Sequence, residues 1–173
     1  AQALASGERT PPHWAGLRFF NVYGPNEYHK TGQLSIALAA YEQLRASGRC
    51  RLFRSDRPDI AHGGQKRDFV WIDDCVAAML FLLDQAKTAG LFNIGSGAAH
   101  SFQDMALAVG AALDRAPSFD YVDMPPALSA QYQYFTQAPL DRLRASGFTR
   151  AMTAPSIGVK AYVDGYLSRP DRY

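Results

Sequence analysis

Residues 16–32 read GLRFFNVYGPNEYHKTG, and the rest of the chain can be interpreted outward from this stretch. It opens with an apolar run of strand length, made of Leu17, Phe19, Phe20 and Val22. The sequence YGPN at 23–26 ends the strand, and the polar loop EYHK at 27–30 precedes a helical pattern that begins near Gln33. Open α/β sheets bind their ligands where a buried strand ends in such a loop. The stretch therefore predicts a ligand site, and it does not by itself predict a reaction.

The composition is that of one ordinary soluble domain. The chain has 173 residues, of which 47% are hydrophobic and 20% charged, and its formal net charge is +2. Basic and acidic residues are interleaved, which argues against a nucleic-acid-binding surface. No apolar run approaches the roughly 20 residues of a membrane-spanning helix and no signal-peptide pattern is found, so we expect a cytoplasmic protein without a membrane partner.

The cysteines and histidines predict neither a disulfide nor a metal site. Cys50 and Cys75 are isolated, with no second cysteine or histidine at metal-ligand spacing, and they are expected to be reduced thiols. The four histidines lie in separate segments of the chain.

The apolar periodicity predicts helices that alternate with short strands, which indicates an α/β fold. The predicted strands lie at 17–22, 51–53, 69–72, 91–94 and 119–122. Helices are expected at 33–47, after Asp73 or Asp74 as the capping residue, after Ser101 in a capping-box pattern, and at 140–146 and 157–167. We interpret the chain as the closing strands of a doubly wound sheet, interleaved with a small mixed α/β lobe that binds substrate.

Three motifs carry a resemblance to a known family. LRFFNVYGP at 17–25 and RDFV at 67–70 resemble segments of the extended short-chain dehydrogenase/reductases that act on nucleotide sugars. The sequences NEYHK at 26–30 and YQYFTQ at 132–137 resemble a narrower group, the ADP-L-glycero-D-manno-heptose 6-epimerases. The motifs occur in the expected order, and the similarity covers roughly residues 8–168.

The resemblance implies a Rossmann-type fold and an NADP-dependent epimerase, with NAD as the alternative cofactor. The implied reaction is epimerisation of ADP-D-glycero-D-manno-heptose at C6 through a transient ketone, which supplies heptose for the lipopolysaccharide core. The implied partner is the nucleotide sugar, and a homo-oligomer is expected for the full-length protein. Two alternatives stay open: an epimerase or dehydratase of UDP- or GDP-sugars, and a non-catalytic module that binds a nucleotide sugar.

Lys30 is the candidate catalytic residue. By resemblance, it is one of two groups that exchange a proton with the reacting hydroxyl, and the other is the tyrosine of a Y-x-x-x-K motif. A free lysine titrates near about 10.4, so a base role requires burial or neighbouring cations. On composition alone, Lys30 would be a solvated loop residue. The resemblance also implies that Asn21 hydrogen-bonds substrate and that Val22 lies against the cofactor.

The other candidate substrate contacts follow from the same resemblance. Arg67 would bind the phosphates through its bidentate guanidinium, although without the resemblance a surface ion pair worth ~0–1 kcal/mol is the simpler interpretation. Its neighbour Asp68 is expected to orient other groups or to act as a cap rather than to catalyse. The remaining implied contacts are Gly32, Phe53, Arg54, Ser55, Asp56 and Tyr132, of which Tyr132 belongs to the YQYFTQ motif. In that motif Tyr134 and Phe135 are expected to fill the core.

Two features expected of the family are missing from the sequence. No tyrosine has a lysine four residues later, and GSGAAH at 95–100 has His100 where a dinucleotide fingerprint requires its third glycine, so we assign this segment to a turn. The stretch AQALASGERTPP at 1–12 is typical of a helix end followed by a connector. We therefore expect residues 1–173 to be the C-terminal half of such an enzyme, without its nucleotide-binding half and inactive alone.

Overall fold

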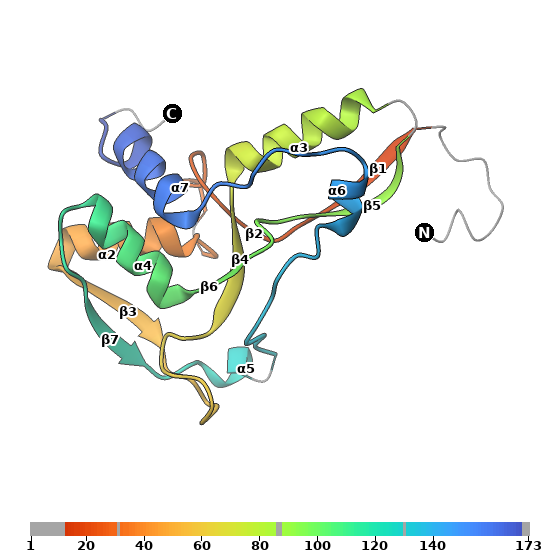
Figure 1. The fold of residues 1–173 in the computed structure, drawn as a ribbon. Coiled ribbons are helices and arrows are strands. Elements are labelled where there is room, and N and C mark those ends of the chain that lie inside the picture. The colour runs from red at the N-terminus through yellow and green to blue at the C-terminus, as the bar shows by residue number, and fades with distance from the viewer. Residues whose placement is uncertain (1–12, 31, 86–87, 130, 171–173) are drawn as a thin grey trace.

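The computed structural model describes residues 13–30, 32–85, 88–129 and 131–170, so the helix end expected within 1–12 lies outside the described residues. Its strands are β1 (Trp14–Phe19), β2 (Asn21–Tyr23), β3 (Arg49–Phe53), β4 (Lys66–Trp71), β5 (Ala89–Ile94), β6 (Ala99–Ser101) and β7 (Ser118–Val122). Its helices are α2 (Ile36–Ser47), α3 (Ile72–Asp84), α4 (Phe102–Ala112), α5 (Pro126–Ser129), α6 (Asp141–Ala145), α7 (Pro155–Tyr162) and the π-helical turn η1 (Val163–Leu167). The alternation of strands and helices confirms the predicted α/β fold (Figure 1).

The apolar run at the start of the chain is divided between two sheets, whereas the sequence predicts one continuous strand. β1 pairs in parallel with β5, and β2 pairs in parallel with β4. The change occurs at Phe20, whose amide donates to the carbonyl of Ile94 at 2.9 Å while its own carbonyl accepts from the amide of Val22 at 2.9 Å. Because parallel strands end at the same edge of a sheet, the loop after β2 lies beside the start of α3.

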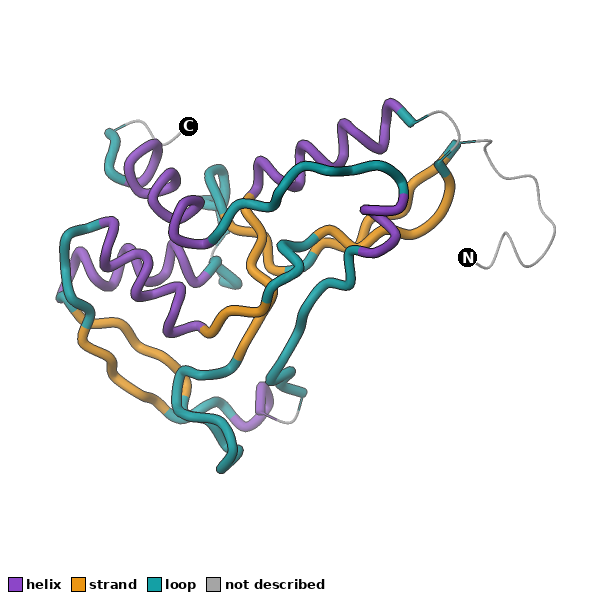
Figure 2. Tube along the Cα trace, in the orientation of Figure 1, coloured by secondary structure: helices purple, strands orange, loops and turns teal. Residues whose placement is uncertain are grey.

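The remaining strands build the other side of the molecule. β4 is the central strand of the sheet β2-β4-β6, and β6 is a short antiparallel strand that periodicity does not predict. β3 and β7 form a separate parallel pair, which lies below α2 and α4 in the view of Figure 1. Figure 2 shows the loop of residues 54–65 projecting from the end of this pair.

The main core lies among α2, α4, α7 and the strands beneath them. Its largest fully buried side chains include Tyr41, Leu44, Met105 and Tyr162. Helix α2 begins at the cap Ser35, whose hydroxyl accepts from the amide of Leu38 at 3.2 Å, and ends at Gly48 with φ of 71°. Helix α4 begins with the expected capping box between Ser101 and Asp104.

Helix α3 differs from the prediction at its start, and one of its faces is exposed. It begins at Ile72 without a side-chain cap, so neither predicted aspartate caps it: Asp73 accepts from the indole N–H of Trp71, and the fully buried Asp74 accepts from the amide of Thr153. One face packs into a second core cluster, separate from the main core. On the other face, the side chains of Val76, Met79, Leu80 and Leu83 are 45–69% exposed. No helix in the described part of the chain is long and apolar enough to cross a membrane.

Candidate active site

The loop after β2 places two candidate residues around one hollow. Val22 and Lys30 line a cavity of about 290 Å³, together with Gly24, Pro25 and Glu27. The side chain of Lys30 is 39% exposed, and its Nζ lies 3.7 Å from Oε2 of Glu27. The strand end therefore presents an apolar side chain and an ammonium group to the same space.

Asn21 begins the same short strand but faces a different space. It is exposed and lines an open hollow of about 530 Å³ with Arg18, Gln133 and Thr136. The structure therefore does not bring Asn21 and Lys30 into one cavity, although only eight residues separate them in sequence.

A third and mostly apolar pocket of about 430 Å³ lies between α2 and the ends of β3 and β7. Two of the candidate substrate residues, Phe53 and Tyr132, line it. Its other lining residues are Leu34, Ile36, Ala39, Arg51, Leu52, Gln65, Phe102 and Val122, none of which the motifs identify. The helix predicted at 33–47 includes Leu34, Ile36 and Ala39, so only the tertiary arrangement shows that they form a pocket wall.

Gln65 is a polar member of this wall that sequence analysis missed. It is 1% exposed, and its side-chain amide donates to the carbonyls of Phe53 at 3.3 Å and Arg54 at 3.1 Å. It thereby connects the end of β3 with the start of β4 and fixes the side of the pocket to which Phe53 belongs.

Arg67 lies beside this pocket and is buried, which removes the alternative of a surface ion pair. It is 8% exposed, and its guanidinium carbon lies 4.9 Å from the ring centroid of Tyr132 and 5.8 Å from that of Phe102. The guanidinium donates to the carbonyl of Lys66 at 2.9 Å, and no ion pair joins it to a carboxylate among the described residues. Burial lowers the pKa of Arg67, with Tyr132 acting in the opposite direction. Such a cation is suited to bind an anion.

The segment Arg54–Asp56 has other partners. Arg54 forms an exposed ion pair with Asp123 at 3.1 Å, and the backbone amide of Ser55 donates to Nδ1 of His62 at 3.0 Å. Asp56 accepts from the hydroxyl of Ser129 at 2.5 Å, and its amide donates to the hydroxyl of Tyr134 at 3.0 Å. None of the three lines the apolar pocket, and their contacts fasten the projecting loop to the segment around α5.

Gly32 and Phe135 also lie outside these cavities. Gly32 is exposed in the turn before α2, with open space where a Cβ would project. Phe135, expected to fill the core, is 59% exposed, so that prediction was wrong. Tyr134 is half-buried and packs edge-to-face against Tyr132, with ring centroids 5.4 Å apart and an interplanar angle of 80°.

Asp68 is fully buried and holds the glycine-rich turn after β5. Its carboxylate accepts hydrogen bonds from the amide of Ser96 at 2.6 Å, the amide of Gly97 at 2.9 Å and the amide of Ala138 at 2.9 Å, and from the Ser96 hydroxyl at 2.8 Å. Gly97 has φ of +80°, which favours glycine. These contacts agree with the assignment of the segment to turn geometry and with an orienting role for Asp68.

The described residues include no group of three or more histidine, cysteine or acidic side chains that could hold a metal ion. Cys50 and Cys75 are both free and buried. Burial, with smaller contributions from Asp74 and Asp68, raises the pKa of the Cys75 thiol to about 12, so this thiol is not a nucleophile at neutral pH.

The sequence of the chain matches one known protein family. Residues 4–95, more than half of the chain, match the NAD dependent epimerase/dehydratase family. The chain belongs to this family. The strand β1, the loop that carries Lys30 and the strand that carries Arg67 all lie within the matched range.

Several relatives of this chain share one name. An ADP-L-glycero-D-manno-heptose-6-epimerase of Nitratidesulfovibrio vulgaris is 46% identical over 159 residues, which are 92% of this chain and 49% of the relative. The enzyme of the same name from Fusobacterium nucleatum is 41% identical over 94% of this chain and 51% of its own. The chain thus spans about half the length of the curated relatives it matches.

Solved structures agree with this fold. The ADP-L-glycero-D-manno-heptose-6-epimerase of Helicobacter pylori is 25% identical with a TM-score of 0.67, over 88% of this chain and 44% of that one. A UDP-glucose 4-epimerase of Thermus thermophilus, solved with NAD, is 24% identical with a TM-score of 0.72, over 94% of this chain and 48% of that one. The similarity to the Thermus enzyme concerns the fold alone.

Proposed function

We propose that this chain is the substrate-side half of an ADP-L-glycero-D-manno-heptose 6-epimerase. The observation that carries the proposal is the 41–46% identity, over nearly the whole chain, to relatives that bear this name. The complete protein would convert ADP-D-glycero-D-manno-heptose to its L-glycero epimer in the cytoplasm, for the heptose of the lipopolysaccharide core, and would act as a homo-oligomer.

The proposed reaction inverts an unactivated carbinol carbon. A nicotinamide cofactor, NADP in this proposal with NAD as the alternative, would accept a hydride from this carbon when bound and return it to the opposite face. Val22 would hold the cofactor, and the fit is supported by the apolar side chain of Val22 in the wall of the hollow that Lys30 also lines. Lys30 would exchange a proton with the C6 hydroxyl, as base in one direction and acid in the other. Its side chain is 39% exposed here, so the burial that a base role requires would come from the upstream half, the cofactor and the substrate. Asn21 would hydrogen-bond the sugar from the neighbouring hollow.

The nucleotide end of the substrate would occupy the apolar pocket. Phe53 and Tyr132 line that pocket, and Arg67 offers a buried guanidinium beside it, which suits a diphosphate that must leave water. Gly32, Arg54, Ser55 and Asp56 belong to the proposed contact surface by resemblance, although their present contacts are with protein groups.

The partner tyrosine and the glycine-rich phosphate loop would come from upstream sequence, so we propose that the 173-residue chain does not turn over alone. The test is to join the chain to its native upstream sequence and to follow the C6 configuration of ADP-D-glycero-D-manno-heptose by NMR. We expect epimerisation in this completed protein and a loss of at least about tenfold in kcat for Lys30→Met, in line with the 10²–10⁴-fold contribution of acid–base groups.

Other outcomes separate the alternatives. Activity on UDP- or GDP-sugars alone would replace the proposed substrate while keeping the reaction class. Binding of NADP without activity on any nucleotide sugar would favour the non-catalytic module.

A further inference from the structure

Glu27 is a buried carboxylate in the loop that carries Lys30, and it is 5% exposed. Its Oε2 accepts from the backbone amide of Ser35, the cap of α2, at 2.8 Å, and its Oε1 accepts from the Ser35 hydroxyl at 2.6 Å. The hydroxyl of Tyr162 in α7 donates to Oε1 at 3.2 Å. One side chain therefore connects the loop to the beginning of α2 and to the buried face of α7, and the positive end of the α2 dipole favours its charge.

The same carboxylate reaches the ammonium group of Lys30. The distance from Oε2 to Nζ is 3.7 Å, and the backbone amide of Lys30 donates to the carbonyl of Glu27 at 3.1 Å. The side chain of Glu27 is 6% exposed and that of Lys30 is 39% exposed, and both line the hollow to which Val22 contributes. The carboxylate is thus the fixed partner of the pair, and the lysine is the partner with space to move.

We infer that Glu27 is a positioning residue for Lys30. A lysine side chain has several rotatable bonds, and ordering it at the moment of reaction costs conformational entropy. A carboxylate that three hydrogen bonds already hold in place gives the ammonium group one preferred location inside the hollow. This inference rests on the proposed function, in which Lys30 exchanges a proton with substrate.

A first experiment measures the link without substrate. The parent chain and Glu27→Gln are treated with acetic anhydride, and acetylation of Lys30 is followed by mass spectrometry with Lys160 as the internal reference. We expect Lys30 to react about threefold faster in Glu27→Gln, because an ion pair that shields the amine is lost. Equal rates in the two proteins would overturn the inference.

The matched control is Asp104→Asn. In both places a carboxylate accepts from the backbone amide of a helix-capping serine, at 2.8 Å for Glu27 and 2.9 Å for Asp104, but of the two only Glu27 is paired with a lysine among the described residues. The control reports the effect of weakening a helix cap, and it should leave the labelling rate of Lys30 unchanged. If Asp104→Asn raises that rate as much as Glu27→Gln does, the effect is structural and the inference is wrong.

A second experiment uses the completed protein. Glu27→Gln should lower kcat about tenfold with little change in KM, since misplacement of a catalytic group affects the chemical step. In a Lys30→Met background the same substitution should change kcat by less than about twofold, because its effect passes through the lysine. A further tenfold loss in that background would overturn the inference.

The two experiments separate this inference from the function on which it rests. A completed protein that is inactive on ADP-heptose would contradict the proposed function, while the labelling result would still decide whether Glu27 holds Lys30.

If Glu27→Gln does not fold, Glu27→Asp keeps the charge on a shorter side chain and should raise the labelling rate of Lys30 by about 1.5-fold or more. Labelling of Glu27→Asp at the parent rate would then overturn the inference.

Discussion

At the scale of single residues, Arg67 is a buried charge that the described part of the fold leaves without an ion pair, which is why we propose it as an anion site. Its guanidinium lies between two aromatic rings and has no carboxylate partner among the described residues. Replacing an unpaired buried charge by an apolar side chain should not destabilise the chain, but it should remove the proposed anion site. For Arg67→Met we expect an unchanged or higher Tm and binding of ADP weakened by at least about tenfold in a calorimetric titration.

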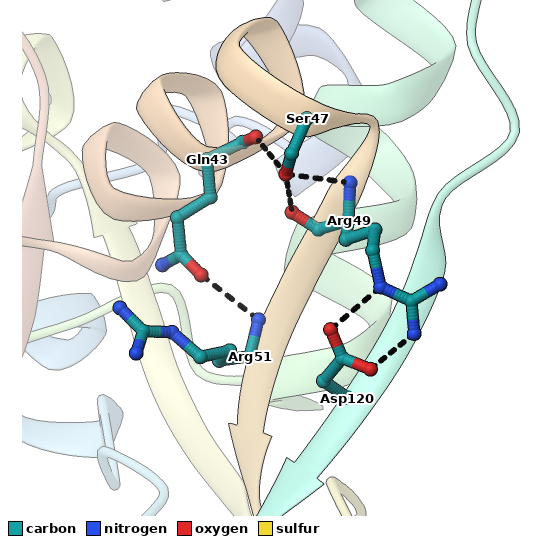
Figure 3. Close-up of polar contacts among 5 residues, drawn as sticks. All are labelled: Gln43, Ser47, Arg49, Arg51 and Asp120. Carbon is teal, nitrogen blue, oxygen red and sulfur yellow. Dashed lines mark hydrogen bonds and ion pairs between the residues drawn. The ribbon is translucent and has the colours of Figure 1, made fainter.

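Arg49→Met is the control for that prediction. Arg49 is exposed and forms a two-pronged contact with Asp120 on the outer side of the β3–β7 pair, near Gln43, Ser47 and Arg51 (Figure 3). An exposed ion pair contributes little to stability, so neither Tm nor ADP binding should change. Equal loss of ADP binding in the two variants would mean that Arg67 acts only through the net charge.

A motif can single out residues in the sequence, but the sequence does not show which partners the tertiary structure brings to them. The motifs singled out Lys30, Arg67 and Tyr132, and the structure places Arg67 against the Tyr132 ring. Glu27 stood in the same NEYHK motif, yet nothing in the sequence shows that Ser35 and Tyr162 bury it. Gln65 carried no signal, because its role depends on two carbonyl groups at the end of another strand.

At the scale of elements, Asp68 is the point where β4, the turn after β5 and the segment that follows Tyr132 are joined. Four hydrogen bonds end on this fully buried carboxylate. An asparagine would turn an N–H₂ group toward donors and leave buried groups unpaired, so Asp68→Asn should lower the free energy of unfolding by about 2–4 kcal/mol. Urea unfolding followed by circular dichroism measures this.

Asp73→Asn provides the comparison for that substitution. Asp73 is exposed and accepts one hydrogen bond, from the indole of Trp71 at 3.0 Å. Its loss should cost less than about 1 kcal/mol. A similar cost for the two variants would contradict the joining role of Asp68.

The sequence predicted the elements whose ends are set by neighbouring residues, and it did not predict those that depend on hydrogen bonds from distant strands. The capping box of α4 and the glycine that ends α2 are encoded within a few residues, so the sequence indicated both helices. The division of the first apolar run at Phe20 and the short strand β6 arise because distant strands supply the hydrogen bonds. The sequence predicted Asp73 or Asp74 as the cap of α3, but both lie inside its first turn, and Asp74 accepts from Thr153, which lies far along the chain.

At the scale of the whole molecule, one apolar side is left open. β1 pairs with β5 alone in the described part of the chain, and a parallel pair of strands is normally flanked by further strands and covered on both faces. Beside it, the exposed face of α3 carries Leu80 and Leu83, and Leu80, Leu83, Met79 and residues of β1 line a hollow of about 330 Å³. We propose that the upstream half of the completed protein covers this side.

The 173-residue chain alone should therefore associate through this side. We expect it to bind the dye ANS and to elute from a sizing column ahead of a monomer, and we expect Leu80→Lys/Leu83→Lys to lower ANS fluorescence about twofold or more and to shift elution toward the monomer. Ile157→Lys is the control, because Ile157 is 65% exposed on α7, away from β1. An equal effect of the control would show that added charge, rather than this face, prevents association.

In the completed protein the double substitution Leu80→Lys/Leu83→Lys should instead lower Tm, since a lysine would then have to be buried against the upstream half.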